Sequence, residues 1–307
     1  MNKVSVWISA LRLRTLPLAA SSIILSAGLA LQAQLFNALI FSLALVTALL
    51  LQILSNLAND YGDAASGADN AARVGPLRAM QTGLISQASM KKAIILITAL
   101  CFITGLSLLL VALGSDFKSW LLFLLFGLLA ITAAISYTMG KLPYGYYALG
   151  DLAVFIFFGL LGVAGSYYLY ALTFSYWLLL PACSVGALSV AVLNINNMRD
   201  MYSDKAANKT TLVVLWGRKA AFIYHIVLIL LAPLLACLYL INNENTQFWQ
   251  FIFLLSVLPL GKSCCSLYAA IRDDLRDGSL FNRELKNTAV STFVFALLLA
   301  LVLTPVN

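Results

Sequence analysis

Charge is scarce in this chain, and so are the residues that build most soluble active sites. Only 10% of its 307 residues are charged, whereas a soluble domain carries roughly 25%. It has one histidine, His225, and none of its five cysteines forms a Cys-x-x-Cys pair. The low charge excludes an ordinary soluble domain. The lone histidine argues against a zinc site, a Ser/His/Asp triad and haem ligation. No Walker A loop is present, which argues against nucleotide-driven transport.

Hydrophobic residues dominate instead, at 62% of the chain. Continuous apolar runs of about 20 residues predict membrane-spanning helices, because a strand of a membrane barrel would alternate. We therefore expect an all-α, multi-pass membrane protein with a single domain over 1–307, which begins with a short interfacial helix at about 3–14. Nine spans are predicted, at about 16–33, 37–58, 92–113, 119–138, 149–171, 174–196, 219–241, 248–270 and 288–305.

The loops between these spans differ in charge. Of nineteen Lys and Arg, only Lys118 falls clearly on one side, Lys262 falls within a span, and the rest fall on the other side. The positive-inside rule then predicts that the N-terminus and the long basic loops are cytoplasmic. The net charge of +7 is explained by this orientation and requires no nucleic-acid partner.

Two acidic segments follow spans two and six on this same side. Residues three, four or seven apart share a helix face, so each segment predicts a ridge of side-chain oxygens. The first ridge holds Asn56, Asp60 and Asp63, and the second holds Asn196, Asp200, Asp204 and Asn208. The repeated Asn-x-x-x-Asp core favours two related four-helix halves followed by a ninth helix.

Carboxylates without Cys or His partners are typical ligands of a hard cation such as Mg²⁺, which is commonly held together with a phosphate. Carboxylates beside a membrane are also functional candidates by default. Cations and a tyrosine lie in the neighbouring loops and predict a diphosphate site: Arg73, Arg78, Tyr137, Lys141 and Lys209. A diphosphate at one membrane face, with its lipid tail among the helices, describes an allylic polyprenyl diphosphate.

These motifs resemble those of the UbiA-type intramembrane prenyltransferases. The resemblance covers nearly the whole chain and rests on Asn59-Asp60-x-x-Asp63, Tyr137-x-x-x-Lys141 and Asp200-x-x-x-Asp204. Further stretches are similar to the branch that acts on 1,4-dihydroxy-2-naphthoate in menaquinone biosynthesis. They include Arg12-Leu-Arg14-Thr-Leu-Pro17, Gly75-Pro76-Leu-Arg78 and Asn196-Asn197-Met-Arg199-Asp200. Asp151 departs from the pattern, because glutamate is expected there.

The resemblance implies transfer of a polyprenyl group to 1,4-dihydroxy-2-naphthoate, with loss of diphosphate and CO₂, in a bacterial plasma membrane. It implies Mg²⁺ bound by Asn56, Asp60, Asp63, Asn196, Asp200 and Asp204. The catalytic residues it implies are Asp60, Asp63, Asp69, Asp200, Asp204 and Lys141, with Asp63 or Asp69 helping to deprotonate the acceptor. Phe155, Phe157, Phe158 and Tyr167 are candidates to face the allylic cation.

Two alternatives remain open at this stage. The same donor site could serve another aromatic acceptor, such as 4-hydroxybenzoate or homogentisate. An ion-coupled carrier is the alternative from a different class, although its site is expected near the midplane and not at one face.

Overall fold

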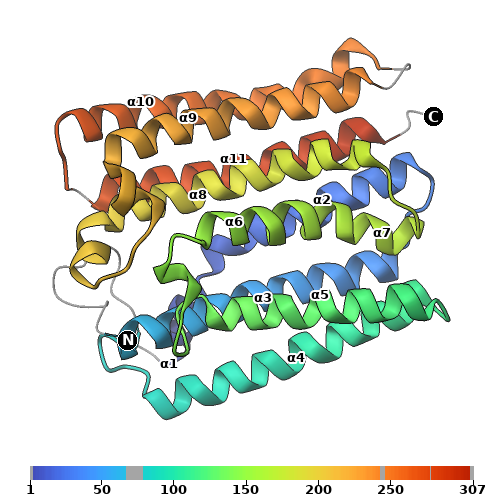
Figure 1. The fold of residues 1–307 in the computed structure, drawn as a ribbon. Coiled ribbons are helices and arrows are strands. Elements are labelled where there is room, and N and C mark those ends of the chain that lie inside the picture. The colour runs from blue at the N-terminus through green and yellow to red at the C-terminus, as the bar shows by residue number, and fades with distance from the viewer. Residues whose placement is uncertain (1–2, 67–78, 243–245, 277, 305–307) are drawn as a thin grey trace.

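Long helices, running side by side, account for nearly all of the structure (Figure 1). It is a computed structural model that describes residues 3–66, 79–242, 246–276 and 278–304. The first part contains α1 (Lys3–Leu11), η1 (Leu13–Thr15), α2 (Leu16–Gln32), α3 (Ala38–Ala65), α4 (Gln87–Leu113) and α5 (Phe117–Ser136). Within these described ranges there is no strand, which confirms the all-α prediction.

The second part is interrupted more often by short turns. Its elements are η2 (Tyr144–Tyr146), α6 (Gly150–Val154), η3 (Phe155–Gly165), α7 (Ser166–Ala171), η4 (Tyr176–Leu178), α8 (Leu179–Ala206), α9 (Leu212–Ile241), η5 (Phe248–Val257), α10 (Leu258–Arg272) and α11 (Gly278–Leu303). Taken with adjoining turns, the described helices include nine that are long and apolar enough to cross a membrane. The nine predicted spans are confirmed, and the protein is an integral membrane protein.

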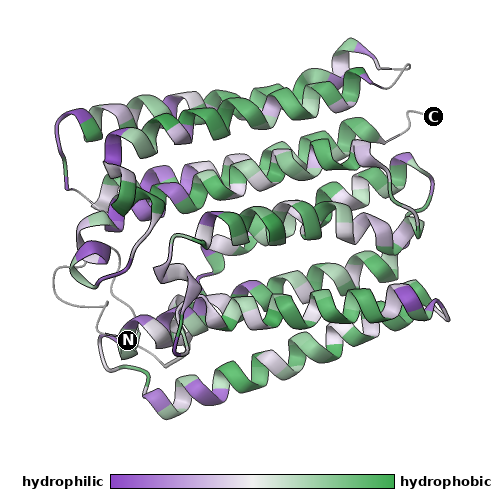
Figure 2. Cartoon of the chain, viewed as in Figure 1, coloured by the Kyte–Doolittle hydropathy of each residue, from purple (hydrophilic) through white to green (hydrophobic). Residues whose placement is uncertain are grey.

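Several of the spans extend further than the sequence predicted, including the two that carry the acidic segments. The second was expected to end near residue 58 and the sixth near 196, but α3 runs to Ala65 and α8 runs to Ala206. Both helices therefore carry their acidic segments as regular helical turns. Hydrophilic residues on α3 and α8 gather toward the end of the bundle where the N-terminus lies (Figure 2).

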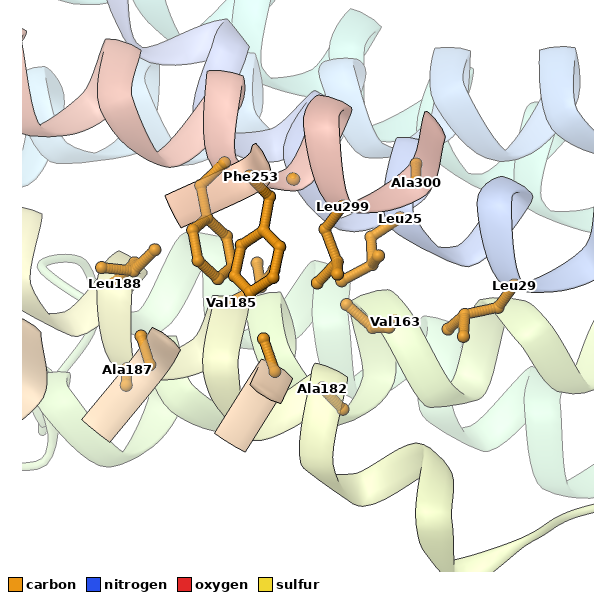
Figure 3. Close-up of a cluster of buried hydrophobic side chains, with 14 of the residues drawn as sticks. Leu25, Leu29, Val163, Ala182, Val185, Ala187, Leu188, Phe253, Leu299 and Ala300 are labelled. Atoms are coloured by element: carbon orange, nitrogen blue, oxygen red, sulfur yellow. The ribbon is translucent and has the colours of Figure 1, made fainter. Parts of the chain in front are cut away.

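An extensive cluster of buried hydrophobic residues surrounds α8 and α11. Phe253 from η5 packs among Leu25 of α2, Val185 of α8 and Leu299 of α11, all essentially inaccessible to solvent (Figure 3). Small residues bring the helix backbones together here. A Cβ added at Gly28 would lie 2.5 Å from the Cα of Ala300, so α2 and α11 touch along their backbones.

The fifth span is not a uniform α-helix. Its middle part, η3, is a π-helix of 11 residues. Glycines on its two sides approach neighbouring helices: Gly162 lies against Ser22 of α2, and Gly159 lies against Gly186 of α8. The Ser22 hydroxyl also donates a 2.5 Å hydrogen bond to the Phe158 carbonyl. These contacts fix the span against α2 and α8 and set the direction of its phenylalanines.

Candidate active site

The first acidic ridge lies on the last turns of α3. Asn56, Asp60 and Asp63 all lie on this helix and are buried. The loop that follows α5 is held closely against this helix. The Thr138 hydroxyl donates to the Ala58 carbonyl at 3.1 Å, and a Cβ on Gly62 would lie only 2.4 Å from the Thr138 carbonyl oxygen. Gly62 thus permits the backbone contact that places Tyr137 beside the ridge.

The second ridge lies on the last turns of α8. Asp200 and Asp204 are buried, and Asn196 is half-buried one turn earlier. The prediction that Asn208 extends this ridge is wrong, because α8 ends at Ala206. Asn208 adopts a left-handed backbone with φ of 55°. That turn reverses the chain, so Lys209 donates its backbone N–H to the Asp204 carbonyl at 2.8 Å.

Three acids of the two ridges are paired with cations of the chain. Arg12 Nη2 lies 2.7 Å from Asp60 Oδ1, and Lys209 Nζ lies 3.4 Å from Asp204 Oδ1. Arg199 donates to both oxygens of Asp200, from Nε to Oδ1 at 2.8 Å and from Nη2 to Oδ2 at 2.5 Å. A buried carboxylate without compensation is costly, so these pairs keep the two ridges charged inside the protein.

Two loops pair with each other beside the ridges: the loop that contains residues 146–148 and the loop between α8 and α9. The Ala148 N–H donates to the Thr210 carbonyl at 2.8 Å, and the Thr210 N–H donates to the Tyr146 carbonyl at 3.1 Å. This pairing sets Lys209 Nζ 5.7 Å from the centre of the Tyr146 ring, within cation–π distance. The Tyr146 hydroxyl donates to Asp63 Oδ1 at 3.2 Å. Tyr146 and Lys209 therefore connect the first ridge to the second.

Burial also fixes the protonation of the loop tyrosines. It raises the pKa of Tyr137 to about 12 and raises the pKa of Tyr146 above its ordinary value. Both phenols keep their protons at neutral pH and act as hydrogen-bond donors toward the acids or a bound anion.

One cavity of about 410 Å³ adjoins both ridges and continues between the helices. Its polar end is lined by residues from α3, α8 and the flanking loops. The rest is lined by apolar side chains of α2, α3, α4, α5, the fifth span and α8, as far as Leu109, Phe123 and Leu169. Phe157 and Phe158 of η3 line its wall. The cavity therefore offers one end for a charged group and a long apolar remainder for a hydrocarbon.

The structure brings most of the predicted site residues to this cavity: Asn56, Asp63, Tyr137, Asn196, Asp200, Asp204 and Lys209. Asp60 does not line it and lies buried behind Arg12, which does. Lys141 is exposed and does not line it. Asp69, Arg73 and Arg78 lie outside the described residues.

Besides Arg12, two further cations that the sequence reasoning had not assigned to the site line the cavity. They are Arg14, on η1, and Arg199, on α8. Arg199 precedes Asp200 directly, and a helical projection places it on the flank of the ridge. Arg14 was treated only as a topology signal and part of a motif, although its place just before a span at the acidic face pointed to the site.

The donor set fits magnesium held jointly with a phosphate-bearing ligand. Within the described ranges, no three carboxylate, histidine or cysteine side chains converge on a single point as in an all-protein cage. Mg²⁺ commonly binds through one or two carboxylates plus substrate phosphates, which this arrangement permits. Asp204 Oδ2 is buried and has no hydrogen-bond partner among the described residues, so it is an available oxygen at the polar end of the cavity.

Residues 20–282 match the UbiA prenyltransferase family. The 1,4-dihydroxy-2-naphthoate octaprenyltransferase of Escherichia coli K12 is 44% identical over 97% of this chain and 96% of its own. The protein of the same name from Haemophilus influenzae is 41% identical over 88% of this chain and 87% of its own.

Solved structures of more distant proteins share the fold. A UbiA homologue of Aeropyrum pernix K1 has a TM-score of 0.63 at 17% identity, covering 90% of this chain and 94% of that one. A UbiA homologue of Archaeoglobus fulgidus, bound to DMAPP and Mg²⁺, has a TM-score of 0.52 at 17% identity, covering 92% and 98%. With a match over most of its length and relatives this similar, the chain belongs to the UbiA prenyltransferase family.

Proposed function

We propose that this protein transfers a polyprenyl group from an allylic polyprenyl diphosphate to 1,4-dihydroxy-2-naphthoate. Diphosphate and CO₂ are lost, and the product is the demethylated naphthoquinol of menaquinone biosynthesis. The single observation that carries the proposal is the cavity itself, whose polar end adjoins both acidic ridges and whose remainder is apolar. The names of the two bacterial relatives support the naphthoate as acceptor.

The diphosphate would occupy the polar end of the cavity. Asn56, Asp63, Asn196, Asp200 and Asp204, with Asp60 just behind them, are the residues that would hold Mg²⁺ there. Bound magnesium would supply positive charge to the departing diphosphate oxygens. Lys209 also lines the polar end of the cavity, and the protonated Tyr137 is a further hydrogen-bond donor on the cavity wall. Charge developing on the leaving group is thus met by preorganised donors, the main source of rate in such a site.

The prenyl chain would lie along the apolar remainder. When the bond from its first carbon to the diphosphate oxygen breaks, both electrons leave with the oxygen and an allylic cation remains. Phe157 and Phe158 line the cavity and offer aromatic faces to this cation, and the apolar wall keeps water from capturing it. The electron-rich naphthoate ring then attacks the cation, and the ring carbon–carboxylate bond breaks to release CO₂ and restore the aromatic ring.

We further propose that the polar end of the bundle is cytoplasmic. The basic loops and the N-terminus lie at the end that carries both ridges, as the positive-inside rule expects for a bacterial plasma membrane. The soluble acceptor and the diphosphate product would then enter and leave on the cytoplasmic side. Asp69, Arg73, Arg78 and Lys141 stay predicted contributors from the loops of this face.

The test uses purified, detergent-solubilised protein with a polyprenyl diphosphate, Mg²⁺ and either 1,4-dihydroxy-2-naphthoate or 4-hydroxybenzoate. Mass analysis should find a prenylated naphthoquinol without the carboxylate. Product from 4-hydroxybenzoate alone would keep the donor site and refute the acceptor. Asp200→Ala should abolish turnover in folded protein, and Asp273→Ala, at the exposed end of α10, is the matched control.

A further inference from the structure

The cations that line the cavity are not equivalent. Arg12 is paired with Asp60, Lys209 with Asp204 and Arg199 with Asp200. Arg14 differs from all three. Among residues 3–66, 79–242, 246–276 and 278–304, no ion pair joins a carboxylate to Arg14, which lines the same cavity as Arg199. Two guanidinium groups that face one cavity, of which one has no counterion, form a site for an anion.

Arg199 cannot share its own counterion with Arg14. Both oxygens of Asp200 accept from Arg199, as the distances above show. The remaining Arg199 nitrogen donates to Asn282 of α11 at 2.6 Å, and Nη2 also donates to Asn196 at 2.8 Å. Four hydrogen bonds to three side chains hold the buried Arg199 in place, so it contributes charge at a fixed position. Arg14 is exposed along the cavity and has its donors available.

A small apolar cluster lies directly beyond these two cations. Leu18, one turn after Arg14 on α2, packs with Val192 of α8, and Phe158 and Leu285 pack against them. All four line the cavity. Val192 lies two helical turns before Arg199 on the same face of α8, because seven residues separate them. A cationic rim over an apolar floor matches a flat aromatic acid, whose ring is apolar and whose carboxylate is at one edge.

We propose that this corner is the acceptor subsite and that Arg14 binds the carboxylate of the aromatic acceptor. The inference deepens the proposed function and rests on it. The other end of the polar region, where Asp63, Asp204, Tyr146 and Lys209 meet, is rich in acids and suits a diphosphate held with Mg²⁺. In the described part of the chain, the acid at the Arg14 corner is Asp200, and both of its oxygens accept hydrogen bonds from Arg199. Arg199 touches both regions through Asp200, so the two ligands would lie side by side as bond formation requires.

The proposal predicts that Arg14 recognises the carboxylate and not the ring. The test compares 1-hydroxy-2-naphthoate, a stable analogue of the acceptor, with 1-naphthol, which has the same ring without the carboxylate. Their binding to detergent-solubilised protein is measured by ligand fluorescence in EDTA, with no donor present. Arg14→Gln should weaken binding of the naphthoate about tenfold or more, as for one lost charge-assisted bond, and leave 1-naphthol unchanged. Arg14→Lys should restore part of the loss, and Arg272→Gln, an exposed cation on α10, is the control.

Three results would overturn the subsite. Equal loss for naphthoate and 1-naphthol would show a general disturbance of the cavity. An unchanged naphthoate affinity would show that Arg14 does not bind the carboxylate. Weakened binding of inorganic diphosphate in Mg²⁺, with naphthoate unaffected, would assign Arg14 to the donor. A separate turnover assay distinguishes failure of the proposed function from failure of the subsite. If wild-type protein prenylates 4-hydroxybenzoate and not the naphthoate, the function fails, yet the carboxylate comparison on Arg14 still decides the subsite.

Discussion

Lys209→Met tests whether the cation beside Asp204 serves the fold, the reaction or both. Lys209 Nζ lies 3.4 Å from Asp204 Oδ1, and both side chains are less than a tenth exposed. Removing one partner of a buried ion pair costs about 3–5 kcal/mol. We expect about 3 kcal/mol here, at the lower end, because the pair borders the cavity and water reaches it when the cation is lost.

The stability loss should follow from the carboxylate left behind. Denaturant unfolding in detergent should therefore show that Lys209→Met with Asp204→Asn is more stable than Lys209→Met alone, because the double variant leaves no uncompensated charge. Lys205→Met, an exposed lysine on the last turn of α8, is the matched control and should unfold like the wild type. A double variant no more stable than Lys209→Met would refute the ion-pair reasoning.

Turnover measurements test whether Lys209 also has a role in the reaction. A preorganised donor to a developing anion contributes about 2.7–4 kcal/mol, so Lys209→Met should lower kcat by about a hundredfold or more. The assay is product formation at saturating donor and acceptor, with folding checked by size-exclusion chromatography. A kcat within about twofold of the wild type would show that Lys209 is a counterion of the fold and takes no part in diphosphate departure.

Further predictions concern the ridges and the loop beside them. Gly62→Ala should destabilise the protein by about 1–3 kcal/mol and lower turnover, because the new Cβ meets the Thr138 carbonyl, whereas Gly261→Ala, which has open space, should do neither when both are unfolded in parallel. EDTA should stop turnover but move the melting temperature by only a few degrees, since cations of the chain already neutralise three of the ridge acids; unfolding on chelation would contradict this. Burial raises the pKa of Tyr137 to about 12, so its proton is retained up to about pH 10. Tyr137→Phe should then lower kcat without changing the shape of the pH profile below about pH 10, and a basic limb that vanishes in the variant would show the phenol titrating.

Much of the architecture followed from the sequence because hydrophobic runs specify membrane spans directly. The acidic ridges followed too, since i, i+4 and i+7 spacing defines one face of any helix. The extensions of α3 to Ala65 and α8 to Ala206 were missed because polarity and not helix propensity was used to end the spans. The end of the second ridge was misjudged for the opposite reason, since Asn208 keeps helical spacing but lies in a left-handed turn.

The charge pairing inside the site was beyond sequence reasoning. Nothing local indicates that Arg12 pairs with Asp60, 48 positions away, or that Asp60 lies behind the cavity wall. Such pairs depend on how helices distant in sequence pack together. The sequence also did not indicate that two neighbouring arginines differ in pairing. Arg12 has a carboxylate partner, whereas Arg14 has none in the described ranges.

The π-helical stretch Phe155–Gly165 gives its span a tolerance to length change that a uniform α-helix lacks. In a π-helix each hydrogen bond spans one residue more than in an α-helix, so deletion of one residue can be absorbed by return to α geometry. The same deletion within an α-helix rotates everything beyond it by about 100°. Deletion of a single residue in this stretch is thus structurally less costly than the same deletion in a uniform α-helix. Such a deletion would also turn Phe157 and Phe158 relative to the cavity, so changes in chain length here provide a route by which the hydrocarbon wall is reshaped while the acidic ridges stay in place.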